Sequence, residues 1–91
     1  MIEIIWDEKF KRIYKNWSKK HPELVESFRN KIELFVNNPF HHSLKTHSLS
    51  GILKGLWSLW INYEYRLIFK FMEREKNKVL LIDIGTHDEV Y

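Results

Sequence analysis

The sequence predicts an α+β fold, a two-layer sandwich with an N-terminal strand, a helical hairpin and then a series of antiparallel strands. Two observations support this fold class. Apolar residues follow the helical period over residues 7–37, and they follow the two-residue alternation of a strand after residue 55. This order favours a helix pair that covers one face of the sheet and leaves the other face open. With 91 residues, the chain is expected to form a single domain over residues 1–91.

The first half of the chain predicts a strand and two helices. Residues 2–6 are almost all apolar and indicate a short opening strand. Asp7 suits the N-cap of a helix, and apolar residues at helical spacing predict that this helix covers residues 7–20. Pro22 suits a first helical turn, so a second helix is expected over residues 22–37.

The second half predicts three strands that follow one another in the sheet. Aromatic and aliphatic residues indicate strands over residues 56–63 and 65–71, joined by a tight turn. Residues 73–78 are mostly charged and are expected to form the next turn. Residues 79–84 are almost continuously apolar, which predicts an interior strand. Residues 44–49 can add a further strand at the edge.

The composition favours an anionic ligand and excludes several classes of protein. The net charge is +3, and no cysteine is present for disulfides or thiolate metal sites. The absence of cysteine suits a reducing cytoplasm, which is the expected location. No run of about 18 apolar residues predicts a membrane span, and the first residues lack the pattern of a signal peptide. Positive charge is most one-sided over residues 41–70, which hold Lys45, Lys54, Arg66 and Lys70 against Glu64.

Three segments, residues 45–51, 63–66 and 85–91, hold side chains that together suit RNA cleavage without a metal. In that reaction a base removes the proton of the attacking ribose 2′-hydroxyl, a cation stabilises the phosphoryl oxygens, and an acid protonates the departing 5′ oxygen. Histidine serves as base or acid near neutral pH, and arginine matches phosphate with a planar fork. Taken singly, His47 or Arg66 is more often an ordinary surface residue.

The same segments resemble motifs of the RelE/ParE superfamily of type II toxins, and the nearest branch is that of the YafQ-like toxins. Residues 47–51 (His-Ser-Leu-Ser-Gly) resemble the family's His-x-Leu-x-Gly segment. Residues 55–58 and 62–69 resemble its central hairpin. Residues 85–88 (Gly-Thr-His-Asp) with Tyr91 resemble its terminal Gly-Thr-His-x-x-x-aromatic end. The resemblance covers essentially the whole chain and implies the RelE-like fold.

The resemblance implies an endoribonuclease, or mRNA interferase, that cuts mRNA at the ribosome without metal or cofactor. It also implies a cognate antitoxin as protein partner. By position, His47 and His87 would be the general acid and base, and Arg66 would stabilise the phosphate. Tyr91 would be the terminal aromatic that contacts RNA. Lys45 and Lys54 would contact RNA phosphates.

The central hairpin departs from the YafQ-like pattern. Members of that branch have a His and an Asp there, and the corresponding positions of this chain hold Ile61 and Tyr65. Arg66 instead follows the pattern of other branches of the superfamily. The division of labour between His47 and His87 therefore stays open.

Three other interpretations compete with RNA cleavage. The chain could be a ParE-like toxin that inhibits DNA gyrase by binding alone, although that branch generally lacks the paired histidines. It could also be an inactive homologue that only binds an antitoxin. His41 and His42 with His47 could be metal ligands, but no carboxylate stands at ligand spacing, so no metal site is predicted.

Overall fold

The computed structural model describes residues 1–72, 74 and 77–91 of the chain. It confirms the predicted α+β class and the order of the main elements. In chain order these are β1 (Glu3–Ile5), α1 (Glu8–Lys20), α2 (Val25–Asn37), β2 (His47–Ser48), β3 (Trp57–Trp60), β4 (Tyr65–Phe71), β5 (Lys78–Thr86) and α3 (His87–Val90). Short 3-10 turns lie between them: η1 (Pro22–Leu24), η2 (His42–Leu44) and η3 (Gly51–Leu53).

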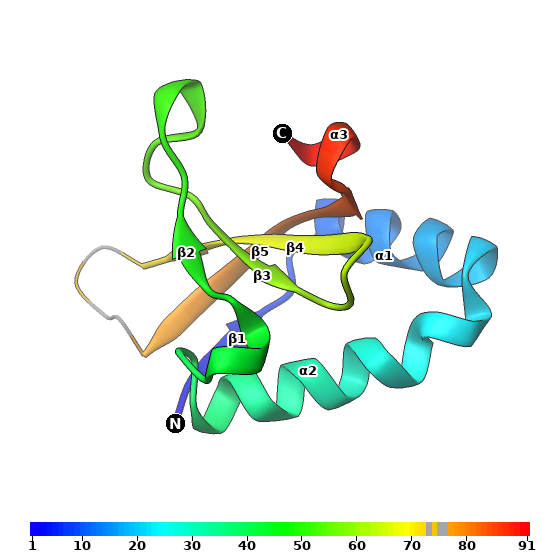
Figure 1. Cartoon of the computed structure of the whole chain (residues 1–91), viewed down its shortest axis with the longest axis horizontal. Helices are drawn as coiled ribbons and strands as arrows, with labels where there is room; N and C mark the ends of the chain where they lie inside the picture. The colour runs from blue at the N-terminus through cyan, green and yellow to red at the C-terminus, as the bar shows by residue number, and fades with distance from the viewer. Residues whose placement is uncertain (73, 75–76) are drawn as a thin grey trace.

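The strands form one five-stranded sheet in the order β1-β5-β4-β3-β2 (Figure 1). β1 pairs with β5 in parallel, and the other neighbours are antiparallel. β5 therefore has a partner on each side, as its apolar sequence predicted, and β2 forms the edge expected over residues 44–49. The meander places the central strand β4 between β3 and β5, with antiparallel hydrogen bonds to both.

The helices α1 and α2 cover one face of the sheet, where the core lies. The Oδ1 atom of Asp7 accepts the N–H of Phe10 at 2.8 Å, which fixes the start of α1 at the predicted N-cap. Phe35 of α2 meets Phe69 of β4 edge to face, with ring centroids 4.9 Å apart. Fully burying a side chain of this size contributes about 1.5–3 kcal/mol. The most deeply buried side chains come from both layers: Phe10, Phe35, Leu59, Leu67, Phe69, Val79 and Leu81.

Several boundaries differ from the expected ones for local reasons. The second helix is divided, because Pro22 begins the 3-10 turn η1 and α2 starts only at Val25. β3 ends at Trp60, since the Oδ1 atom of Asn62 accepts the N–H groups of Glu64 and Tyr65 and turns the chain there. The charged turn expected over residues 73–78 includes residues 73, 75 and 76, which lie outside the described residues.

The face of the sheet opposite α1 and α2 is partly covered by α3, which the sequence did not predict. α3 follows β5 directly and packs back onto the sheet beside Gly85 (Figure 1). The rest of this face, called the open face below, stays free of helices in the described part of the chain. Every helix in that part of the chain is too short or too polar to cross a bilayer.

Candidate functional site

The strand register places two predicted site residues, His47 and Arg66, on the open face. His47 of β2 pairs with Ser58 of β3, and Trp60 of β3 pairs with Arg66 of β4. Directly paired residues of antiparallel strands point to the same side, and neighbours along a strand alternate. Because Leu59 is buried in the core under the helices, Ser58 and Trp60 point to the open face. His47 and Arg66 therefore share that face.

Arg66 is held in place by the turn that precedes its strand. Only 7% of the residue is exposed. Its Nη1 atom donates to three backbone oxygens, those of Asn62 at 3.0 Å, Tyr63 at 2.8 Å and Tyr65 at 3.4 Å. Within the described residues, Nε and Nη2 have no hydrogen-bond partner, so the other edge of the guanidinium is available. A guanidinium anchored at one nitrogen can offer a planar pair of donors to a phosphate.

Two cationic side chains contact the ring of Trp60 on the open face. The Cζ atom of Arg66 lies 4.1 Å from the centroid of the Trp60 ring, and the Nζ atom of Lys45 lies 5.1 Å from it. Each such contact contributes about 0.5–2 kcal/mol, depending on desolvation. The strand alternation allowed only one of Trp57 and Trp60 to face this side, and Trp60 is that residue. Its role in holding the cations was not predicted, because the Lys45 contact depends on the fold of a loop.

His47 has a defined tautomer. Its Nδ1 atom lies 2.8 Å from the carbonyl oxygen of Lys45, and a carbonyl can only accept. Nδ1 therefore carries the hydrogen, and the neutral ring presents the lone pair of Nε2. Lys45 adopts a left-handed backbone conformation with φ of 49°, at the end of η2 immediately before β2. The exposed Nε2 is thus available to take a proton from a ligand, or to return one.

The C-terminal residues reach the same face through α3. The hydroxyl of Tyr91 donates a short hydrogen bond to the Oγ atom of Ser58, the residue paired with His47. The ring of His87 meets the ring of Tyr91 edge to face, with centroids 4.4 Å apart. Ser58 therefore connects the terminal aromatic to the strand that lies beside His47. Ser58 was not predicted, since a buried serine in a strand has no distinguishing pattern.

α3 is stabilised by a capping box that positions His87. The Oγ1 atom of Thr86 accepts the N–H of Glu89 at 3.3 Å, and the Oε1 atom of Glu89 accepts the N–H of Thr86 at 2.8 Å. The hydrogen bonds that the backbone and the side chain of Thr86 make to the Glu89 carboxyl hold its pKa below its ordinary value, because they favour the ionised form. His87 stands at the first position of this helix and is exposed, with its Nδ1 atom 3.5 Å from Asp88.

Lys54 is the predicted residue that the structure does not bring to the others. It follows η3 in the loop between β2 and β3, and it is exposed. In the part of the chain that the structure describes, no hydrogen bond or cation–π contact joins it to His47, Arg66 or Tyr91. The open face therefore combines His47, Lys45 and Arg66 around Trp60, with His87 and Tyr91 connected through Ser58.

The two positions that depart from the YafQ-like pattern lie under the sheet. Ile61 is 1% exposed and Tyr65 is 8% exposed, and both belong to the core. The ring of Tyr65 contacts Trp17 of α1 at a centroid distance of 5.8 Å. Side chains at these positions point toward the helices, so they cannot reach a ligand on the open face.

Comparison with known proteins places the chain in a family. The family model described as "Bacterial toxin of type II toxin-antitoxin system, YafQ" matches residues 2–91. No curated protein sequence matches the chain. The solved YafQ of E. coli strain BL21(DE3) superimposes with a TM-score of 0.78 at 19% identity, covering 100% of this chain and 99% of that one.

Two further solved structures are similar in the same way. The YoeB/ParE toxin of Agrobacterium tumefaciens has a TM-score of 0.73 at 22% identity, covering 94% of this chain and 99% of that one. The toxin in the E. coli DinJ-YafQ complex has a TM-score of 0.75 at 20% identity, covering 100% of this chain and 99% of that one. These likenesses confirm the RelE-like fold. The chain belongs to the YafQ family of bacterial toxins of type II toxin–antitoxin systems.

Proposed function

We propose that this toxin is a metal-independent endoribonuclease that cleaves mRNA through attack of the ribose 2′-hydroxyl on the adjacent phosphorus. The observation that carries the proposal is the arrangement of the open face. The anchored guanidinium of Arg66 and the free Nε2 of His47 share that face, and α3 brings His87 to it through Tyr91 and Ser58. A base, an acid and a phosphate-binding cation are the parts that this reaction requires.

Each residue has a role that its contacts support. One imidazole removes the proton of the 2′-hydroxyl, and the other protonates the departing 5′ oxygen. Arg66 binds the non-bridging phosphoryl oxygens with the edge that the turn carbonyls leave free. Lys45 adds positive charge beside Trp60, and Tyr91 contacts the RNA next to His87. The 2′-hydroxyl is supplied by the substrate, so DNA is not cleaved.

We further propose that the substrate is mRNA on the ribosome in the cytoplasm and that a cognate antitoxin inhibits the toxin. The solved DinJ-YafQ complex supports a protein partner for this family. The chain carries a net charge of +3, and its candidate site is exposed. An acidic antitoxin segment that covers the open face would neutralise Lys45 and Arg66 and block access of RNA.

The experiment is cleavage of a defined mRNA by the purified toxin, alone and with ribosomes, in the presence of EDTA. We expect fragments that end in a 2′,3′-cyclic phosphate, and we expect His47→Ala and His87→Ala each to lower the rate at least about 100-fold. Lys31→Ala, which removes a positive charge from α2 on the opposite side of the sheet, serves as the control and should cleave within about threefold of the wild type. Full cleavage by the double histidine variant would refute the proposal. Gyrase inhibition without any RNA cleavage would support the ParE-like alternative.

A further inference from the structure

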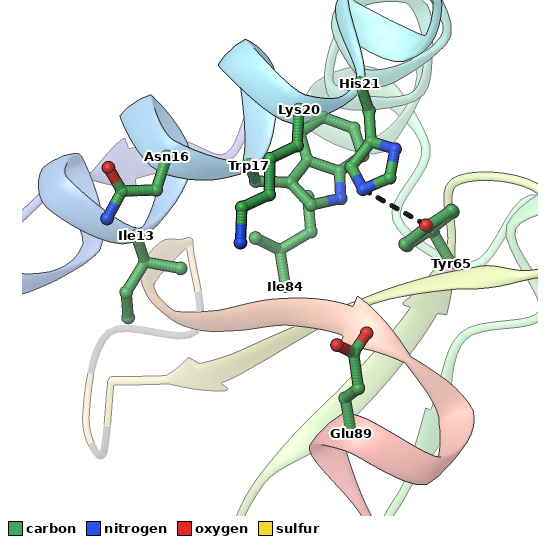
Figure 2. Close-up of a pocket in the computed structure, with 8 residues that line it drawn as sticks. All are labelled: Ile13, Asn16, Trp17, Lys20, His21, Tyr65, Ile84 and Glu89. Carbon is green, nitrogen blue, oxygen red and sulfur yellow. Dashed lines mark hydrogen bonds between the residues drawn. The ribbon is translucent and has the colours of Figure 1, made fainter.

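A polar pocket lies between α1 and α3, and none of the residues that line it is assigned to cleavage. It has a volume of about 280 Å³ and is formed between the C-terminal end of α1 and the first turn of α3 (Figure 2). Asn16, Lys20 and His21 line it from α1 and the residue that follows, and Glu89 enters from α3. A volume at the lower end of the range for ligand pockets suits one small flat group.

His21 and Tyr65 form one wall of the pocket, and their side chains hydrogen-bond to each other. The hydroxyl of Tyr65 lies 3.2 Å from the Nε2 atom of His21. Burial raises the pKa of Tyr65, and Glu64, Glu89 and Glu23 raise it further, so the hydroxyl keeps its proton and donates it. The two ring centroids lie 4.9 Å apart. This wall therefore offers a fixed flat surface rather than free hydrogen-bonding groups.

Two other walls carry opposite charges, the Glu89 carboxylate and the Lys20 ammonium. The Glu89 carboxylate accepts from the backbone N–H of Thr86 and also interacts with the Thr86 side chain, but no ion pair joins it to a cation within the described residues. The ammonium group of Lys20 forms no ion pair in that part of the chain. Figure 2 shows the Lys20 ammonium and the Glu89 carboxylate entering the pocket from opposite sides. The pocket thus offers a strong acceptor on one side and a strong donor on the other.

These features favour a neutral, flat ligand with a donor edge next to an acceptor edge. The carboxylate disfavours an anionic group, and the ammonium disfavours a guanidinium. Guanine carries two adjacent donors, N1–H and the N2 amino group, that pair with a carboxylate. Its O6 and N7 atoms accept from an ammonium. Adenine offers a carboxylate only its amino group, and uracil only its N3–H.

We propose that this pocket selects a guanine base of the RNA, with Glu89 and Lys20 reading its two edges. The inference rests on the proposed function, since that function makes RNA the substrate. Glu89 is two residues from His87 on the same short helix. Occupation of the pocket would therefore fix α3 as well as the position of the RNA. A toxin of this kind prefers cleavage sites with a guanine near the scissile bond.

The first test is binding of the four nucleoside monophosphates to the intact toxin, observed by NMR at the indole N–H of Trp17. Trp17 lines the pocket, and its Nε1 has no hydrogen-bond partner in the described residues. The four ligands share one phosphate, so differences between them report the base. We expect GMP to bind at least about fivefold more tightly than AMP, CMP or UMP. A mononucleotide has no phosphodiester bond between nucleotides that the toxin could cleave, so this result is independent of the nuclease proposal.

Two variants with matched controls assign the contacts. Glu89→Gln, which retains a capping-box residue, should reduce the preference for GMP to about twofold or less, and Glu26→Gln should leave it unchanged. Lys20→Met should weaken GMP binding at least about threefold relative to Lys19→Met, which removes the same charge from the same helix. The amide spectrum of each variant shows whether it is folded.

Four outcomes would overturn the inference. The four nucleotides could shift Trp17 equally, or they could shift only the indole of Trp60 on the open face. The antitoxin could instead be the only molecule that shifts Trp17, which would make the pocket a protein-binding site. Cleavage without any guanine preference, mapped by primer extension, would leave the nuclease proposal standing and refute only the base pocket.

Discussion

At the scale of single residues, the chemistry of the open face depends on how the backbone restrains a few side chains. Three carbonyl oxygens fix one nitrogen of Arg66, and one carbonyl fixes the tautomer of His47. These contacts restrict the side-chain conformations before any ligand binds, so less conformational entropy is lost when a phosphate binds. The same contacts determine what each substitution does to stability and to activity.

Substitution of Arg66 should affect catalysis and folding together. Arg66→Ala is expected to lower kcat about 10²–10³-fold, because a preorganised donor to the phosphoryl group is removed. It should also lower the free energy of unfolding by about 1–3 kcal/mol, since buried carbonyls lose their donor. Arg66→Lys keeps the charge but not the fork, and should recover stability better than kcat. Single-turnover cleavage and urea denaturation measure the two effects. An Arg66→Ala variant with unchanged kcat would exclude phosphate stabilisation by this residue.

Trp60 should act as a positioning residue through its ring. Trp60→Phe keeps an aromatic face for Arg66 and Lys45, whereas Trp60→Leu removes it. We expect kcat/KM to fall about three- to tenfold more in the leucine variant than in the phenylalanine variant. The two variants should unfold at similar urea concentrations. Equal kcat/KM values for both would show that the ring only fills space.

At the scale of elements, the short helix α3 connects the predicted terminal histidine to the sheet. It follows β5 without a loop, and Thr86 caps it. The sequence motif at residues 85–88 predicted the importance of this end of the chain. It did not predict a helix, because four residues carry no periodicity that can be recognised. Gly85 shows why the motif begins with glycine, since α3 packs directly against its backbone.

Gly85→Ala should displace α3 from the sheet. The added Cβ atom would lie 3.1 Å from Cγ1 of Val90 and 3.2 Å from Cβ of Glu89, which is tighter than ordinary packing. Overpacking of this kind costs about 1–3 kcal/mol. We expect the hydrogen bond from Tyr91 to Ser58 to weaken and the cleavage rate of this variant to fall further than that of the Lys31→Ala control. A variant with wild-type activity and an unchanged Tyr91 resonance would contradict this account of α3.

The stability of α3 should depend on pH through Glu89. The pKa of this carboxyl is lower in the folded chain than its ordinary value of 4.5, chiefly because of the hydrogen bonds to Thr86. Its contribution is therefore present above pH 4.5 and is lost as the pH falls through the folded value. Hydrogen exchange of the amides of residues 89–91, compared at pH 6 and at about pH 4 after correction for intrinsic rates, should show this loss. Glu89→Gln should remove the difference between the two conditions.

At the scale of the whole molecule, much of the fold could be predicted because hydrophobic spacing reports it directly. The helical period before residue 38 and the alternation after residue 55 predicted the two layers and the meander of the last three strands, but not the parallel pairing of β1 with β5. The contacts between distant segments could not be predicted in this way. The pocket between α1 and α3 has Lys20 and Glu89 on opposite walls. These two residues are almost seventy positions apart, and nothing in the sequence around either of them predicts a pocket. The contacts of Trp60 and Ser58 with site residues could be recognised only from the strand register of the structure.

The whole account depends on two histidines from distant parts of the chain acting on one phosphate. The most direct test is an NMR titration of the toxin with an RNA oligonucleotide that carries a 2′-O-methyl group at the scissile position and cannot react. The account predicts that the imidazole signals of His47 and His87 shift together and saturate with one Kd, while those of His41 and His42 stay unchanged. Shifts of only one of the two site histidines, or separate Kd values for them, would contradict a shared site on the open face.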